Sequence, residues 1–257
     1  KDVIGAYRSI DFSFVRNKYK DAGTLYCFDV LDEKIVTGYY IKLACFRHLR
    51  DLQRQGQEDF SYVYSVDAFN GFLKFLSLVP NVDDLSQKLK PMNWQLFIFS
   101  QLFAWLDLDG LPRYVNIILS MARAQGKTMI AGISLNYSFL IETIGLSNQD
   151  FLVSSLNFEQ TMKLYTYVKS MMSRIIENEP FKSLATETGL QLYTREIKAT
   201  ADSNSIQTIS FESGKFDSKH FKLAVADEVG ELRSDEGISK ITSGQVNTEG
   251  SRFIEIS

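Results

Sequence analysis

The sequence predicts an α/β fold with a mostly parallel sheet, preceded by a helical segment. After Pro91, short apolar runs alternate with stretches of helical periodicity, an order typical of parallel sheets flanked by helices. Before Lys90, apolar residues recur at helical spacing and strand patterns are scarce. We therefore expect a helical segment over residues 1–90 and an α/β domain over residues 91–257.

The first segment contains one clear amphipathic pattern. Apolar residues recur there at three- and four-residue steps, which predicts one buried helix face. These residues are Val36, Tyr39, Leu43, Phe46 and Leu49. His48 lies in the same stretch without a second ligand nearby, so we expect a structural role for it. Cys27 and Cys45 lack metal-ligand spacing and are expected to be buried thiols.

The second segment is predicted to begin with a helix and then to alternate. The helices are expected at about 93–106, 130–140 and 158–176. The strands are expected at 115–121, 151–155, 189–200 paired with 205–211, 221–226 and 253–256.

A phosphate-binding loop is predicted between the first of these strands and its helix. Ala124, Gln125 and Gly126 precede Lys127 and Thr128. Glycine lets backbone N–H groups approach phosphate oxygens, lysine neutralises phosphate charge, and the threonine hydroxyl is a ligand for Mg²⁺. The match is imperfect, because Met121 stands where such loops usually have their first glycine.

Two adjacent carboxylates follow the apolar strand 221–226. We expect Asp227 to hold the Mg²⁺ shell and Glu228 to polarise the attacking water. Inside the loop, Arg123 is expected to stabilise charge in the transition state. Upstream, Gln95 follows Trp94 at the start of a helix, where an amide can read the adenine edge. Together these residues indicate nucleotide hydrolysis with ATP and Mg²⁺ as cofactors.

The order of these motifs resembles the ATPase domain of tailed-bacteriophage terminase large subunits. "KPMNWQLFIFSQLFAWLD" at 90–107 is similar to that family's adenine-binding helix. "VNIILSMARAQGKTMIAGISL" at 115–135 resembles its deviant Walker A, and "FKLAVADEVGEL" at 221–232 resembles its Walker B with the catalytic glutamate. The segments "GYYIKLACFRHLRDLQ" at 38–53 and "FLVSSLNFEQTMKLYTYVKSMM" at 151–172 extend the resemblance.

The resemblance implies a P-loop NTPase of the additional-strand, catalytic-glutamate class. It implies ATP-driven translocation of double-stranded viral DNA into a procapsid, in the cytoplasm of an infected bacterium. The implied partners are the portal protein, a small terminase subunit and further copies in a ring. It also implies a C-terminal nuclease domain, which we expect to be missing from this chain because its last strand has barely ended.

Two further features are implied by the family. A coupling motif is expected after the strand that follows Walker B; Ser257 is preferred over Thr242-Ser243-Gly244, which follows no convincing strand. An arginine acting on a neighbouring subunit is also expected, with Arg195 as one candidate.

Two alternatives remain open from the sequence. One is another P-loop translocase or a helicase-like ATPase, and the other is a binding module with a decayed phosphate loop.

The overall charge of the chain excludes fewer classes of nucleic-acid-binding protein than its sign first suggests. The formal charge of −3 excludes a strongly basic static nucleic-acid binder, but not a motor that must release DNA in each cycle. No apolar run is long enough to predict a transmembrane helix.

Overall fold

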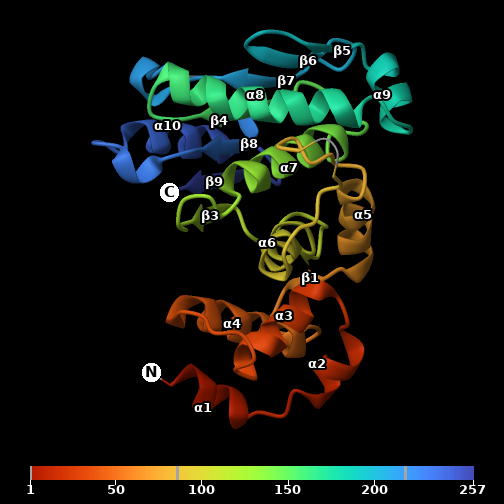
Figure 1. The fold of residues 1–257 in the computed structure, drawn as a ribbon, viewed down its shortest axis with the longest axis vertical. Coiled ribbons are helices and arrows are strands. Elements are labelled where there is room, and N and C mark those ends of the chain that lie inside the picture. The colour runs from red at the N-terminus through yellow and green to blue at the C-terminus, as the bar shows by residue number, and fades with distance from the viewer. Residues whose placement is uncertain (1, 85–86, 217–218) are drawn as a thin grey trace. The chain divides into compact units, whose positions relative to one another are not determined.

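The computed structural model describes residues 2–84, 87–216 and 219–257. It contains two compact units. Figure 1 shows the fold, coloured by residue number. The helical unit comprises residues 1–72 and 90–114, and the sheet unit comprises residues 73–89 and 115–257. The boundary between residues 90 and 91 remains a prediction.

The helical unit consists of short helices and one small antiparallel pair of strands. Its helices are α1 (Val3–Arg8), α2 (Ser13–Lys18), α3 (Ala22–Leu31), α4 (Tyr39–Arg54), the first part of α5 (Val66–Leu76) and α6 (Asn93–Phe103). Strand β1 (Tyr62–Tyr64) pairs antiparallel with β2 (Trp105–Asp107).

Two sequence predictions in this unit need correction. The buried side of α4 carries Cys45, His48, Leu49 and Leu52, whereas Val36 lies before the helix and is 99% exposed. Tyr39 and Leu43 of the predicted face are also exposed, so that face shares only Leu49 with the buried side of α4. The predicted helix 93–106 ends at Phe103, since Trp105 leaves helical geometry to pair with Tyr64.

The sheet unit has a seven-stranded sheet with helices between its strands. Its strands are β3 (Asn116–Leu119), β4 (Asp150–Ser154), β5 (Leu190–Leu192), β6 (Glu196–Ala199), β7 (Asn204–Thr208), β8 (Phe221–Ala226) and β9 (Arg252–Ile256). Its helices are α7 (Lys127–Leu140), α8 (Phe158–Ile175), α9 (Phe181–Glu187) and α10 (Glu236–Gln245), with single 3₁₀ turns η1 (Phe211–Ser213) and η2 (Val229–Glu231).

The strand order in this sheet is β3-β9-β8-β4-β7-β6-β5. The first five strands in that order are parallel, and the β5–β6 hairpin completes the sheet in antiparallel fashion. The mostly parallel α/β fold is thus confirmed. The single strand predicted over residues 189–200 is two strands, because Tyr193–Arg195 form the turn between β5 and β6.

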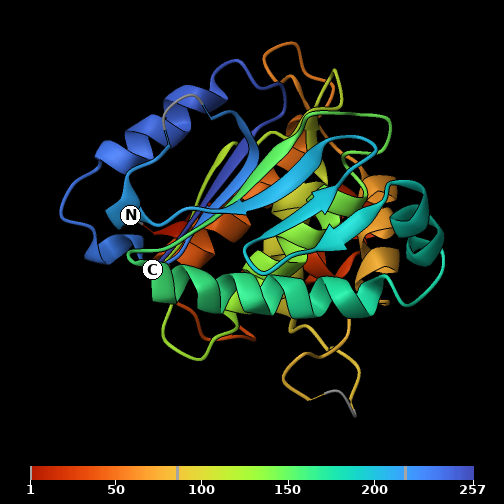
Figure 2. The same ribbon diagram turned by 90° about the horizontal axis from the view of Figure 1, so that it is seen from above.

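Both faces of the sheet are covered by helices, which explains its continuous apolar strands. Figure 2 shows α8 and α10 on opposite sides of the sheet. Successive strand residues point to opposite faces. Accordingly, Leu152 clusters with Ile241 of α10, whereas its neighbour Phe151 stacks edge-on against Phe139 of α7.

Both cysteines are free and buried, as predicted. Within the described ranges, no helix has the length and apolar character needed to cross a bilayer.

Candidate functional site

Four segments with polar side chains follow the carboxyl ends of four parallel strands. The phosphate loop follows β3, Ser257 follows β9, Asp227 and Glu228 follow β8, and Ser155 follows β4. Since these strands are adjacent and parallel, their carboxyl ends meet at one edge of the sheet. Ligands of open α/β sheets bind at this edge.

The loop between β3 and α7 has a backbone shape suited to phosphate. Gly126 is the N-cap of α7 with φ +79°, and Ala124 also has positive φ, at +60°. Alternating left-handed residues turn successive N–H groups inward, and the start of a 14-residue helix adds the positive end of its dipole. The Lys127 ammonium donates to the Met121 carbonyl oxygen at 3.3 Å, so this side chain folds back over the loop.

Met121 fits this loop without needing to be glycine. Among the described loop residues, positive φ occurs at Ala124 and Gly126 but not at Met121. The Met121 N–H donates to the Ser257 carbonyl oxygen at 3.1 Å, so the hydrogen bonding between β3 and β9 continues to residue 121, two residues past the end of β3. The missing first glycine therefore leaves the loop geometry intact.

Asp227 is anchored through its backbone at the end of β8. Its N–H donates to the Ser154 carbonyl oxygen at 3.0 Å, and its own carbonyl oxygen accepts from the Ser155 hydroxyl at 3.2 Å. Burial raises the pKa of the Asp227 carboxyl, while the Glu228 N–H and the Lys127 ammonium act in the opposite direction. A bound cation would favour the ionised form further.

Glu228 adopts an unusual backbone conformation, with φ +58°. A left-handed non-glycine residue costs about 1–2 kcal/mol, and functional sites are enriched in such residues. Its N–H donates to the Asp227 Oδ1 at 3.0 Å. Its Oε2 accepts a hydrogen bond of 2.7 Å from the Gln160 side-chain amide of α8.

Ser257 lies next to the phosphate loop. Its N–H donates to the Leu119 carbonyl oxygen at 3.1 Å, and its carbonyl oxygen accepts from Met121. On the other side, a β-carbon added at Gly230, just after Glu228, would lie 2.6 Å from the Ser257 hydroxyl. Thr242, Ser243 and Gly244, the other candidates for the coupling motif, lie within α10.

The residues at this edge fit ATP with Mg²⁺. The loop offers backbone N–H groups and the Lys127 ammonium for phosphate oxygens. Thr128 and Asp227 offer the hydroxyl and carboxylate oxygens that Mg²⁺ prefers, and Mg²⁺ commonly takes one or two protein carboxylates, completing its shell with water and phosphate. No cluster of three or more acidic, histidine or cysteine side chains able to hold a metal occurs in the described ranges.

Comparison with known protein families identifies this arrangement. The model of the family "Terminase large subunit, ATPase domain" matches residues 93–254. The chain belongs to this family. The match includes α6 of the helical unit, the phosphate loop, the Asp227–Glu228 pair and most of β9, so residues 93–254 form a terminase ATPase domain.

Solved structures with a similar fold agree with this assignment. The large terminase of bacteriophage HK97 is 19% identical, with a TM-score of 0.56 over 74% of this chain and 37% of that protein. The large terminase ATPase domain of Thermus phage P74-26 is 12% identical, with a TM-score of 0.50 over 73% of this chain and 68% of that domain. The chain thus spans 37% of the length of the HK97 terminase. None of the curated proteins matches the chain.

Gln95 is placed in the helical unit of this terminase domain, whereas the phosphate loop is in the sheet unit. Gln95 is the third residue of α6, is 7% exposed, and accepts a hydrogen bond of 2.9 Å from the Met92 N–H through Oε1. This bond caps the helix start. Contact of Gln95 with adenine remains a prediction.

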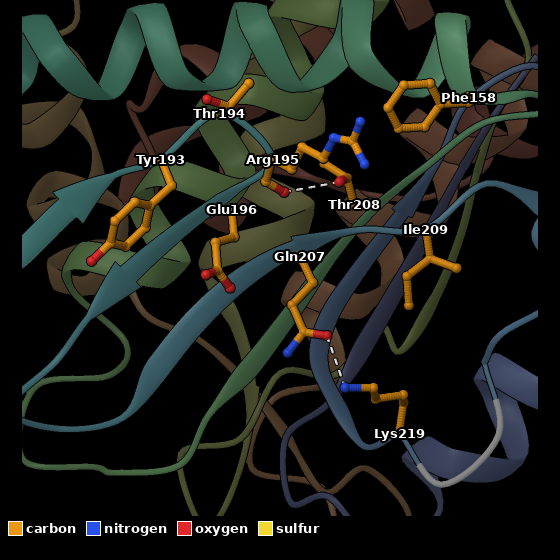
Figure 3. Close-up of a pocket in the computed structure, with 9 residues that line it drawn as sticks. All are labelled: Phe158, Tyr193, Thr194, Arg195, Glu196, Gln207, Thr208, Ile209 and Lys219. Atoms are coloured by element: carbon orange, nitrogen blue, oxygen red, sulfur yellow. Dashed lines mark hydrogen bonds between the residues drawn. The ribbon is translucent and has the colours of Figure 1, made fainter.

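The two arginines singled out from the sequence lie in different surroundings. Arg123 is exposed within the phosphate loop. Arg195 lies in the β5–β6 turn, where its guanidinium is 4.9 Å from the centre of the Phe158 ring and its carbonyl oxygen accepts from Thr208 (Figure 3). Strands β4 and β7 separate β6 from β8, a distance of roughly 14 Å at ~4.8 Å per strand. The backbone of Arg195 therefore lies well away from that of the Asp227–Glu228 pair across the sheet.

The structure adds Gln160 to the residues expected from sequence. It lies in the first turn of α8, three residues after the N-cap Asn157. No motif marks it in the sequence, because its contact with Glu228 depends on packing between segments 68 residues apart.

Proposed function

We propose that this terminase ATPase domain hydrolyses ATP at the edge formed by the ends of β3, β9, β8 and β4. The observation that carries the proposal is the placement of β9 between β3 and β8, at whose ends the phosphate loop and the Asp227–Glu228 pair lie. This inserted strand is the topological mark of the additional-strand class predicted from the sequence.

The residues divide the work as follows. Backbone N–H groups of Ala124, Gln125 and Gly126, with the Lys127 ammonium, bind the phosphates. Thr128 and Asp227 would hold Mg²⁺, which neutralises charge on the phosphate oxygens when bound. Glu228 orients the attacking water and accepts its proton. Arg123 stabilises charge that develops on the transferred phosphoryl group.

Hydrolysis would drive double-stranded phage DNA into a procapsid. Family membership supports a role in DNA packaging, and the wider assembly follows from the resemblance: a ring of copies docked on the portal, with a small terminase subunit, in the host cytoplasm. Ser257, bonded to Leu119 and beside Gly230, is well placed to relay a change at the phosphate loop. Arg195, in the β5–β6 turn and separated from β8 by β4 and β7, is a candidate for action on a neighbouring copy.

Two substitutions test the proposed site. Glu228→Gln keeps the size of the side chain but removes the base, so ATP binding should persist while turnover falls by about 100-fold or more. Lys127→Ala removes the phosphate cation, so ATP binding itself should weaken. Fluorescent-nucleotide titration and a phosphate-release assay measure the two effects. An unchanged hydrolysis rate in Glu228→Gln would overturn the assignment of the base.

A further inference from the structure

We propose that Gln160 is a positioning residue for the carboxylate of Glu228, an inference that rests on the hydrolytic function proposed above. The Gln160 Nε2 lies 2.7 Å from the Glu228 Oε2, the length of a strong hydrogen bond to a charged acceptor. The bond joins the first turn of α8 to the residue after Walker B.

The backbone on the Gln160 side of this bond is fixed. The N-cap Asn157 accepts from the Gln160 N–H through Oδ1 at 2.9 Å. The next residue, Thr161, accepts from the Ser155 N–H through its hydroxyl at 3.0 Å, which ties the helix start to the end of β4. Ser155 in turn donates to the Asp227 carbonyl oxygen. A closed set of hydrogen bonds therefore sets where the Gln160 side chain begins.

The backbone on the Glu228 side is also constrained. Its left-handed conformation and its N–H bond to Asp227 set the direction in which the side chain leaves the chain. These constraints leave the side-chain torsions of Glu228 free. The Gln160 amide is the contact that selects one of their orientations, and a general base must be held within hydrogen-bond reach of its proton.

The second polar atom of Gln160, its Oε1, is buried and has no protein partner among the described residues. A buried acceptor of this kind is normally satisfied by a protein group or by water. Gln160 thus has one atom to hold the base and a second that can accept a hydrogen bond from a water molecule beside it.

Gln160→Met tests the inference, because methionine keeps the length of the side chain and lacks the donor. A hydrogen bond to a charged group contributes about 1.5–3 kcal/mol, so kcat for ATP should fall about 10- to 100-fold. KM for ATP and the affinity for a non-hydrolysable ATP analogue should stay within about twofold, since Gln160 is assigned no phosphate contact. The matched control is Glu159→Gln on the same helix turn, whose side chain is 82% exposed and paired with Lys163; its kcat should not change.

A second measurement does not depend on turnover. The side-chain amide signal of Gln160 in a ¹⁵N–¹H spectrum should shift in Glu228→Ala, while that of the distant Gln191 should not. Two results would overturn the positioning role alone, provided that the wild-type chain is active. One is an unchanged or raised kcat in Gln160→Met, and the other is a Gln160 amide signal that does not shift in Glu228→Ala. A wild-type chain without ATP hydrolysis overturns the proposed function and the positioning role together.

Discussion

His48 is a fully buried imidazole whose hydrogen bonds define its protonation state. The Trp105 indole N–H can only donate, and it donates to His48 Nδ1 at 3.1 Å. Nδ1 is therefore unprotonated, and Nε2 carries the proton, which it donates to the Thr24 hydroxyl at 3.0 Å. Burial, with Arg47 and Arg113 adding to the effect, lowers the pKa of His48 from 6.5 to about 3. The structural role expected for His48 is confirmed.

This pKa shift predicts an acid-sensitive stability. The unfolded chain takes up a proton on His48 below pH 6.5, whereas the folded chain does not until about pH 3. The stabilisation is complete above pH 6.5 and is lost as the pH falls from 6.5 towards 3, by about 1.4 kcal/mol per pH unit over most of this range. Urea unfolding at pH 6.5, 5.5 and 4.5 measures this slope. His48→Gln should flatten it, whereas His220→Gln, at an exposed site, should leave it unchanged.

At the scale of elements, a buried ion pair joins the start of β9 to the end of the phosphate-loop helix. Arg252 is 2% exposed; its guanidinium donates to the Ser138 hydroxyl at 2.9 Å and forms a salt bridge with Glu142. Both partners lie at the C-terminal end of α7 or just beyond it. The pair thus fixes the far ends of two elements whose other ends carry Lys127 and Ser257.

Breaking this pair by removing one partner should be costly. Arg252→Met leaves a half-buried carboxylate without its cation, and we expect the free energy of unfolding to fall by about 3 kcal/mol. Chemical denaturation measures the loss, and Arg252→Met with Glu142→Gln should recover part of it. The matched control is Arg174→Met, which removes an exposed pair with Glu177 and should cost less than about 1 kcal/mol. Equal losses in both variants would contradict the structural role of Arg252.

The elements were predictable where periodicity was strong and local. The predicted runs at 151–155 and 221–226 form the buried strands β4 and β8, because continuous apolar residues suit a sheet covered on both faces. The run at 115–121 forms strand β3 but is not buried throughout: β3 lies at the edge of the sheet, Ile118 is 70% exposed, and Leu119 is its buried member. The β5–β6 turn and the end of α6 at Phe103 were missed. The turn of the β5–β6 hairpin consists of Tyr193, Thr194 and Arg195 and has none of the Gly, Pro, Asn or Asp residues that usually mark a turn. The end of α6 depends on the pairing of β2 with the distant strand β1, which leaves no mark in a local window.

Only part of the candidate site was predictable, namely the residues that follow strands with a clear apolar pattern. Lys127, Thr128, Asp227 and Glu228 stand at strand ends that the sequence already indicated, and the sheet brings those ends to one edge. The contact of Gln160 with Glu228, and the ordinary φ of Met121, arise from three-dimensional packing and backbone geometry. No spacing rule encodes either.

At the scale of the whole molecule, the sheet unit depends on its last strand. Strand β9 is the only neighbour of β3 within the described sheet, and it separates β3 from β8. Its residues Phe253 and Ile254 are buried in the core. Without β9, the phosphate loop would follow a strand with no partner.

Deletion of residues 252–257 should therefore abolish ATP binding and cooperative unfolding of the sheet unit. Deletion of Ser257 alone is the control: it removes two backbone hydrogen bonds, to Leu119 and Met121, but leaves β9 paired. We expect this shorter deletion to keep the fold and to weaken ATP binding moderately. Circular dichroism during heating and nucleotide titration distinguish the two variants. Retained ATP binding after the longer deletion would show that β9 is dispensable for the loop.

The late position of β9 in the chain also matters while the protein is being made. Asn116 of β3 pairs with Phe253, so 137 residues must be synthesised before the two can meet. At about 5–20 residues per second, β3 waits roughly 7–27 s on the ribosome as an unpaired edge. During that interval the nascent chain holds a complete phosphate-loop sequence but no pocket to receive a nucleotide. We therefore expect ATP to bind only after β9 has been made and has paired with β3, and until then β3 is an exposed strand edge of the kind that promotes aggregation.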